Sequence, residues 1–174
     1  MKLTIFIVPL LWLTGCVQIN APQLENAYRH FSPPDDPLAP YTWILTAGDY
    51  RTKVYLFNVQ GQQFFTNEAN DLILIQGQTI TEIRKLGRFN DLIKVNALSD
   101  GQRQVIVNNT LYENQVCTDW DISKDSQNDL QIYIQLCDGA KQQFGTVHYQ
   151  DGEMTYIKQP ISYLKRYIEL KKQL

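Results

Sequence analysis

The sequence predicts a mainly β protein, an antiparallel β-sandwich or open barrel of about ten short strands preceded by a short N-terminal helix. From residue 41 onward, short runs rich in β-branched and aromatic residues are separated by Gly, Asn and Asp. The run LQIYIQL at 130–136 alternates apolar and polar residues along its whole length. Two Asp-Gly pairs, at 138–139 and 151–152, separate three such runs and predict a meander of antiparallel strands.

The first sixteen residues, MKLTIFIVPLLWLTGC, are typical of a bacterial lipoprotein signal. Lys2 precedes an apolar run, Leu3 to Leu13, that has signal-peptide length and is too short to span a bilayer. The run ends in Leu-Thr-Gly-Cys, which fits a lipobox. We therefore expect residues 1–15 to be removed and Cys16 to be acylated. The alternatives are an ordinary secretory segment that contains a Cys, or a buried strand.

Two or more acyl chains hold a protein stably to a membrane, so Cys16 predicts a lipid anchor. Val17, rather than Asp, follows the cysteine and favours the outer membrane, with the protein facing the periplasm. Residues 16–40 are expected to form a lipidated tether. It contains a short helix from Gln23 to Phe31 and a Pro-rich linker, and it leads into a β-rich domain at 41–174.

The expected strands of that domain follow from apolar runs between turn residues. We expect strands or hairpin partners at Lys53–Val59, Gln62–Thr66, Asp71–Gln76, Thr79–Arg84, Gln102–Val107, Leu111–Ile122, Leu130–Leu136, Gln142–Tyr149 and Glu153–Gln159. Residues 86–98 are expected to be a loop leading into a short strand or helical turn. Pro160 is expected to interrupt the chain. Residues 161–174 fit a helix or an edge strand, and we favour the strand, with Lys171 and Lys172 protecting its edge.

The composition excludes several classes of protein. With 16 basic and 18 acidic residues, the chain has no basic field suited to nucleic acid. His30 and His148 are the two histidines and lie far apart in sequence, so we expect no metal site and no cofactor. Cys117 and Cys137 form an even pair in an oxidising compartment, which favours a disulfide over two buried thiols.

No arrangement typical of catalysis occurs in the sequence, and we expect no enzymatic activity. There is no GxSxG, CxxC or HExxH motif. The candidate glycan contact is the triplet Asp119-Trp120-Asp121, an aromatic ring between two acceptors, although a Trp is more often buried in a core. A glycosidase pair drawn from Asp91, Asp119, Asp121 and Asp151 ranks last.

Three stretches resemble the YjbF/GfcB-like lipoproteins, whose genes accompany exopolysaccharide and group 4 capsule clusters. They are Tyr50–Leu92, Trp120 within CTDWDI, and QFGTVHYQDGEMTYIKQPISYLKRYIELKK at the C-terminal end. The chain departs from the family at Phe64-Phe65, where the family has Trp, and at Gln78-Thr79-Ile80, where it has Gly-Arg-Ile or a similar sequence. The resemblance implies an outer-membrane lipoprotein that assists polysaccharide export and has no established catalytic residues.

We therefore expect an accessory or binding component of exopolysaccharide or capsule export, with polysaccharide or export-machinery proteins as partners. The alternative is a general envelope lipoprotein that stabilises or assists a membrane-protein assembly without contacting carbohydrate.

Overall fold

Thirteen antiparallel strands form one sheet in the computed structural model, which confirms the mainly β class. The structure describes residues 42–98, 101–127, 129–138 and 143–173, which belong to one unit, Pro40–Leu174. The predicted signal peptide, Cys16, tether and short helix lie outside the described residues. Within the described ranges, no helix is long and apolar enough to cross a bilayer.

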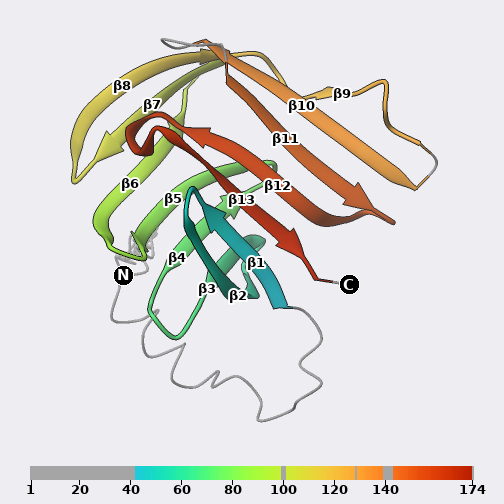
Figure 1. Cartoon of the computed structure of the whole chain (residues 1–174). Helices are drawn as coiled ribbons and strands as arrows, with labels where there is room; N and C mark the ends of the chain where they lie inside the picture. Colours follow the sequence, from blue (N-terminus) through green and yellow to red (C-terminus); the bar gives the residue numbers. More distant parts are fainter. Residues whose placement is uncertain (1–41, 99–100, 128, 139–142, 174) are drawn as a thin grey trace, which may run out of the picture. The chain divides into compact units, whose positions relative to one another are not determined.

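The strands follow one another mostly through tight turns, and they can be traced by colour in Figure 1. A short 3-10 helix, η2 (Ser162–Leu164), connects the last two. The strands are β1 (Thr42–Ala47), β2 (Tyr50–Val59), β3 (Gln62–Thr66), β4 (Leu72–Gln76), β5 (Thr79–Leu86), β6 (Phe89–Ala97), β7 (Gln102–Val107), β8 (Thr110–Cys117), β9 (Asp121–Ile122), β10 (Leu130–Asp138), β11 (Gln143–Gln150), β12 (Glu153–Ile161) and β13 (Arg166–Lys172).

The sheet returns on itself and is barrel-like. Neighbouring strands follow the order β11-β12-β13-β1-β2-β3-β4-β5-β6-β7-β8-β10, and β10 also pairs with β11. The β10–β11 ladder runs from Leu130↔Gln150 to Cys137↔Gln143, whereas β10 meets β8 through Cys137↔Cys117 and Asp138↔Val116. The ring of strands therefore closes at a short seam between β8 and β10.

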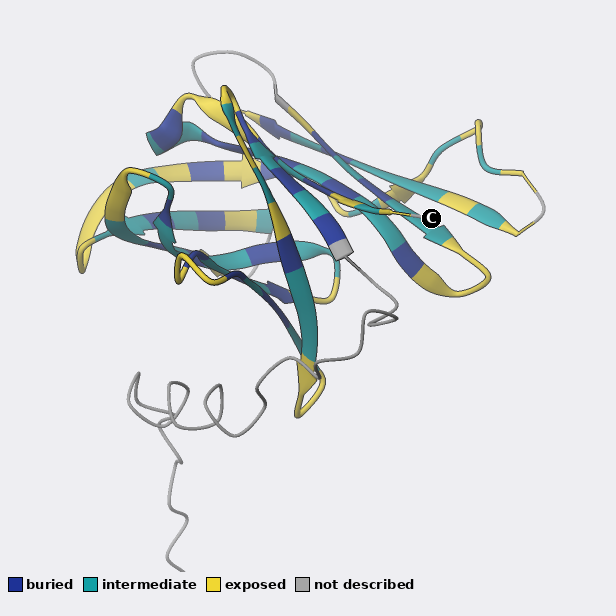
Figure 2. Ribbon diagram, turned by 60° about the horizontal axis from the view of Figure 1, so that its bottom comes forward, coloured by how far each residue is buried: buried dark blue, intermediate teal, exposed yellow. Residues whose placement is uncertain are grey.

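One face of the sheet carries the core. Buried residues alternate with half-buried and exposed ones along the strands, as Figure 2 shows. Alternating side chains of a strand point to opposite faces, so each inward position supplies one apolar group. The fully buried large side chains are Trp43, Leu45, Phe65, Ile73, Ile75, Ile80, Ile83, Ile93, Ile157, Ile161, Ile168 and Leu170.

A buried glutamine, Gln159, makes hydrogen bonds to backbone groups of β5 that have no neighbouring strand to pair with. β6 pairs with β5 only from Glu82 onward, so it does not reach the start of β5. There the Ile80 N–H donates to Gln159 Oε1 at 2.9 Å, and Gln159 Nε2 donates to the Ile80 carbonyl at 3.4 Å. A side-chain amide both donates and accepts, so Gln159 on β12 satisfies both backbone groups of a distant strand.

Asp71, which is 0% exposed, joins three segments at one end of the sheet. Its carboxylate accepts hydrogen bonds from the Tyr50 hydroxyl, from Asn67 Nδ2 at 2.8 Å and from the Gly87 N–H at 2.8 Å. Burial, followed by the bond with Asp71, raises the pKa of Tyr50. Because a buried charge is costly unless it is well hydrogen-bonded, these three donors are what allows Asp71 to occupy the interior.

The structure corrects two expectations in the first two thirds of the domain. Residues 86–98 were expected to be a loop leading into a short strand or helical turn, but residues 89–97 form the nine-residue strand β6, in which only Ile93 and Val95 are buried. The expected strand from Leu111 to Ile122 is two strands, β8 and β9, with residues 118–120 between them.

Two further corrections concern strands β12 and β13. Pro160 lies within β12, and it is tolerated there because the β11 ladder ends at Lys158↔Thr146. For residues 161–174 we favoured an edge strand over a helix. Residues 166–172 do form a strand, β13, but it is not at an edge, because it pairs with both β12 and β1. The lysines at its end therefore do not protect an edge, and Lys172 Nζ contacts Glu153 at 2.8 Å.

Replacing Asp71 should destabilise the fold. Asp71→Ala leaves the Tyr50 hydroxyl and the Gly87 N–H without their acceptor, so we expect the free energy of unfolding to fall by about 3 kcal/mol. Urea denaturation followed by circular dichroism measures this loss. Glu68→Ala, an exposed acid in the same loop, is the control and should change stability by less than about 0.5 kcal/mol. Equal effects of the two variants would contradict the role of Asp71.

Candidate functional site

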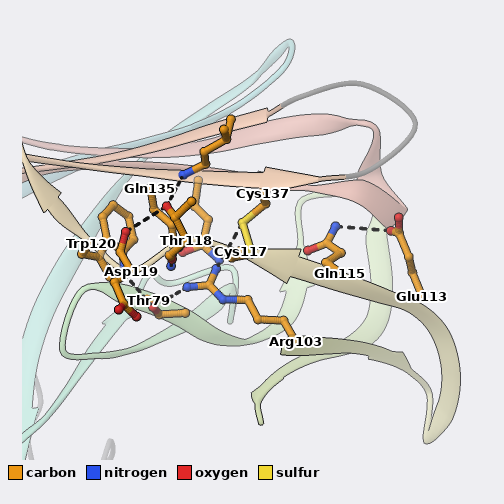
Figure 3. The surroundings of a disulfide bond; sticks show 12 residues. Thr79, Arg103, Glu113, Gln115, Cys117, Thr118, Asp119, Trp120, Gln135 and Cys137 are labelled. Carbon is orange, nitrogen blue, oxygen red and sulfur yellow. Dashed lines mark hydrogen bonds between the residues drawn. A yellow bond between two sulfur atoms is a disulfide. The ribbon is translucent and has the colours of Figure 1, made fainter. Parts of the chain in front are cut away.

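The structure brings the sequence-predicted Cys117, Cys137 and Trp120 together at one corner of the sheet, shown in Figure 3. Cys117 ends β8, Cys137 lies near the end of β10, and the two form a disulfide. The two residues are direct cross-strand partners, so the covalent bond lies at the seam where the ring of strands closes. Cys16 lies outside the described residues.

Hydrogen bonds from Thr118 lengthen this seam beyond the paired strands. The Thr118 N–H donates to the Leu136 carbonyl at 2.8 Å, and the Leu136 N–H donates to Thr118 Oγ1 at 3.1 Å. The Gln135 side chain, which is buried, donates to the Thr118 carbonyl at 2.6 Å. One backbone bond and two bonds that involve side chains thus continue the contact between the two segments beyond the paired residues.

Gly101 fits tightly behind the disulfide. A Cβ built on this residue would lie 2.4 Å from the Cys117 carbonyl oxygen, and its φ of +72° belongs to the left-handed region. Glycine adopts that conformation without steric cost, and here it also allows two backbones to approach each other. The chain therefore enters β7 closely packed against the end of β8.

Trp120 packs against the core instead of presenting its whole ring to solvent. Its indole N–H donates to Thr79 Oγ1 at 3.4 Å. A Cβ added at Gly145 would lie 3.0 Å from the indole ring, so the absence of a side chain on β11 makes room for it. This arrangement fits the core alternative for Trp120. Its neighbours Asp119 and Asp121 are both exposed and flank it at the surface.

Sequence reasoning did not single out Arg103, the charged residue of this corner. Arg103 is 6% exposed and donates to Thr79 Oγ1 at 3.1 Å, with Cys137 Sγ at 4.0 Å. In the described part of the chain its partners are thus a hydroxyl and a sulfur, with no carboxylate, and burial lowers the pKa of Arg103. The only sequence signal was an arginine at an inward position of the QRQVIV alternation.

Asp91, a member of the lowest-ranked glycosidase set, lies on β6 and binds neighbouring side chains. Its carboxylate accepts from the Tyr163 hydroxyl at 2.7 Å and from Asn108 Nδ2 at 2.7 Å. These two hydrogen bonds lower the pKa of Asp91. Across the described ranges, no group of three or more His, Cys, Asp or Glu could hold a metal ion.

Removing the disulfide should weaken the whole domain, because it opens the seam. The bond joins residues 20 apart, and the chain-entropy relation gives a loss of about 3 kcal/mol for the Cys117→Ser, Cys137→Ser double variant. Urea denaturation measures this loss. The rate of hydrogen exchange at the Thr118 and Leu136 amides should rise more in the double variant than the rate at amides of the β2–β3 hairpin. Unchanged stability, or equal acceleration at both places, would contradict the role of the seam.

Comparison with known proteins finds a common fold and no established family. No protein-family model matches the chain, and no curated protein matches it. Among solved structures, it is similar to the crystal structure of the hypothetical lipoprotein YmcC from Escherichia coli, with a TM-score of 0.50 and 14% sequence identity. The match covers 76% of this chain and 82% of that one. At this level of identity, the likeness shows that the two chains share a fold.

Proposed function

We propose that this protein is a non-enzymatic outer-membrane lipoprotein that acts as an accessory or binding component in exopolysaccharide or capsule export. One observation carries the proposal: the chain combines a lipobox ending at Cys16 with the fold of a protein that is itself described as a lipoprotein. The sequence signal and the fold are independent features, and they point to the same membrane-anchored class.

The export role rests on the resemblance to the YjbF/GfcB-like family. The structural neighbour is consistent with a lipoprotein family of this kind. In this proposal Cys16 provides the membrane anchor, and the β-rich domain contacts the polysaccharide or the proteins that export it. Asp119 and Asp121, which are exposed beside Trp120, are proposed as one place of glycan contact.

A binding role agrees with the electrostatics of the acidic side chains. Glycoside hydrolysis commonly requires a carboxylic acid whose pKa is raised, so that it can donate a proton. Asp91 has a lowered pKa because Tyr163 and Asn108 donate to it, and Glu153 has a lowered pKa because of Lys172. Neither shift is in the direction that the general acid of a glycosidase needs.

The alternative function, assistance to a membrane-protein assembly without carbohydrate, is favoured by exposed apolar residues near the seam. Val116 is 56% exposed and Phe144 is 52% exposed. Val116 lies opposite Asp138, and Phe144 lies opposite Leu136, so the two apolar side chains share the outer face on either side of β10. Exposed apolar groups that lie near each other are typical of protein contacts.

Deleting the gene and measuring exported against retained polysaccharide tests the export role. We expect the exported share to fall and a wild-type copy to restore it. A copy with a cleavable secretory signal in place of residues 1–15 and Cys16→Ser should not restore export, since the domain then reaches the periplasm without an anchor.

Unchanged export in the deletion strain would remove the export role. Full restoration by the unanchored copy would remove the need for the lipid. Crosslinking from Phe144 to a stoichiometric protein partner, without any effect on polysaccharide, would favour the alternative function.

A further inference from the structure

Basic side chains gather on the outer face of strands β2, β1, β13 and β12, which lie side by side in the sheet (Figure 1). Side chains alternate between the two faces of a strand. Here the inward positions are the buried Trp43, Leu45, Val54, Ile157, Ile168 and Leu170. The positions between them face outward. Their basic residues, which we call the basic face, are Arg51, Lys53, Lys158 and Lys171.

The strand register places Lys53 and Lys171 on either side of the same residue. Ile44 on β1 pairs with Lys53 on β2 and with Lys171 on β13. Because neighbouring strands lie about 4.8 Å apart, the Cα atoms of the two lysines are about 10 Å apart. Both lysine side chains are exposed, and Ile44 and Lys171 line one hollow on this face. The two ammonium groups can therefore reach the same anionic surface.

A second row crosses the same strands two residues further along β1. Thr46 pairs with Arg51 and with Glu169, and Glu169 in turn pairs with Lys158. Together the two rows hold four basic residues and one acid, Glu169. None of the four basic side chains forms an ion pair with a described residue. The basic face therefore carries net positive charge.

The basic face contrasts with the rest of the chain, whose net charge is −2. At the end of the rows, Asp49 lies in the β1–β2 turn beside Arg166, which donates to the Ala47 carbonyl, so these two charges offset each other. Five exposed acids lie instead on and around β9 and β10, and β11 and β12 separate β10 from β13. They are Asp119, Asp121, Asp125, Asp129 and Asp138. An anionic surface thus attracts this domain by one face.

Tyr167 adds an aromatic ring to the basic face. The residue is 38% exposed, and the Lys158 ammonium lies 4.7 Å from the centroid of its ring. Tyrosine is enriched where proteins meet lipid headgroups, because its ring is apolar and its hydroxyl is polar. The face therefore combines positive charge with an aromatic side chain suited to the headgroup region of a bilayer.

The point at which the tether joins the domain favours a membrane as the partner of this face. β1, which lies in the middle of the two rows, begins at Thr42, and the chain before it leads back to Cys16. The segment between them is about 26 residues long and spans at most about 90 Å when fully extended. A lipid on Cys16 thus keeps the domain near the bilayer, while charges on the domain decide which face turns towards it.

We propose that the basic face docks this domain onto the anionic headgroups of the membrane that holds the Cys16 lipid. Each Lys or Arg near an anionic lipid surface strengthens binding about fivefold. The inference rests on the lipid anchor of the proposed function and is independent of the export role.

Lysine footprinting of the full lipidated chain tests this orientation. The chain is reconstituted into vesicles of phosphatidylethanolamine and phosphatidylglycerol, or of phosphatidylcholine alone, and exposed to a membrane-impermeant amine reagent. Mass spectrometry then measures how fast each lysine reacts. We expect Lys53 and Lys171 to react about fivefold more slowly on the anionic vesicles. Lys94 on β6 and Lys124 after β9 should react equally on both kinds of vesicle.

Neutralising the two lysines tests whether the contact is electrostatic. In a mature chain with Cys16→Ser no lipid holds the protein, so its sedimentation with anionic vesicles reports the domain surface alone. Lys53→Gln, Lys171→Gln should weaken this binding about 25-fold, at about fivefold for each lysine. The control, Lys94→Gln, Lys124→Gln, has the same net charge and should change it by less than about twofold. Raising sodium chloride from about 0.1 M to about 1 M should abolish binding, because it shortens the Debye length from about 10 Å to about 3 Å.

The inference is overturned if Lys53 and Lys171 react alike on both kinds of vesicle, or if the two double variants bind equally well. Protection of these lysines by soluble polygalacturonate, but not by anionic vesicles, would assign the face to an acidic polysaccharide and also overturn it. Unchanged export in the deletion strain, together with protection by anionic vesicles, would instead remove the export role and leave the docking face standing.

Discussion

The closure of the sheet depends on the contact between β8 and β10, and the disulfide between Cys117 and Cys137 joins the two strands there. β8 and β10 meet over two residue pairs, whereas β10 and β11 share a long ladder. A ring of strands closed by so short a contact would open easily, because few hydrogen bonds oppose the entropy gained by separation. The covalent bond and the hydrogen bonds made by Thr118 supply the missing connection. The core inside the ring remains covered as long as this seam holds.

Elsewhere in the domain, buried polar side chains make hydrogen bonds at places where the strand ladders have ended. Gln159 pairs with the backbone of Ile80 across the interior, and Asp71 gathers donors from three segments. Arg103 reaches Thr79 beneath the disulfide. Gln159 and Asp71 bond backbone groups that the strand ladders leave without a partner, and Arg103 bonds a side-chain hydroxyl. Burial of these polar groups is tolerated because they are hydrogen-bonded.

The sequence predicted those parts of the fold in which local pattern and burial agree. The β2–β3 hairpin, the meander from β10 to β12 and the strand character of β13 all follow from alternation and turn residues. The length of β6 was missed because Asp91, a polar residue, lies on the same face as the buried Ile93 and Val95 and interrupts the alternation. In β10 the alternation is correct, yet the buried positions are Gln135 and Cys137 on the polar side, because tertiary pairing at the seam outweighs hydrophobicity there.

The candidate sites were less predictable than the fold. A cysteine pair at a spacing of 20 residues leaves both a disulfide and free thiols open, and cross-strand register decides between them. The burial of Trp120 depends on the space that Gly145 leaves on a distant strand.

The central claim is that a disulfide-closed β domain is carried on a lipidated Cys16, and the mass of the protein isolated from its native envelope tests it most directly. Intact-mass and fragment-ion spectra should show a chain beginning at Cys16 with diacylglyceryl on its sulfur. Non-reduced digestion should give a peptide pair joining Cys117 to Cys137 that is two hydrogens lighter than the separate peptides. A chain that retains residues 1–15, an unmodified Cys16, or free thiols at both positions would contradict the account.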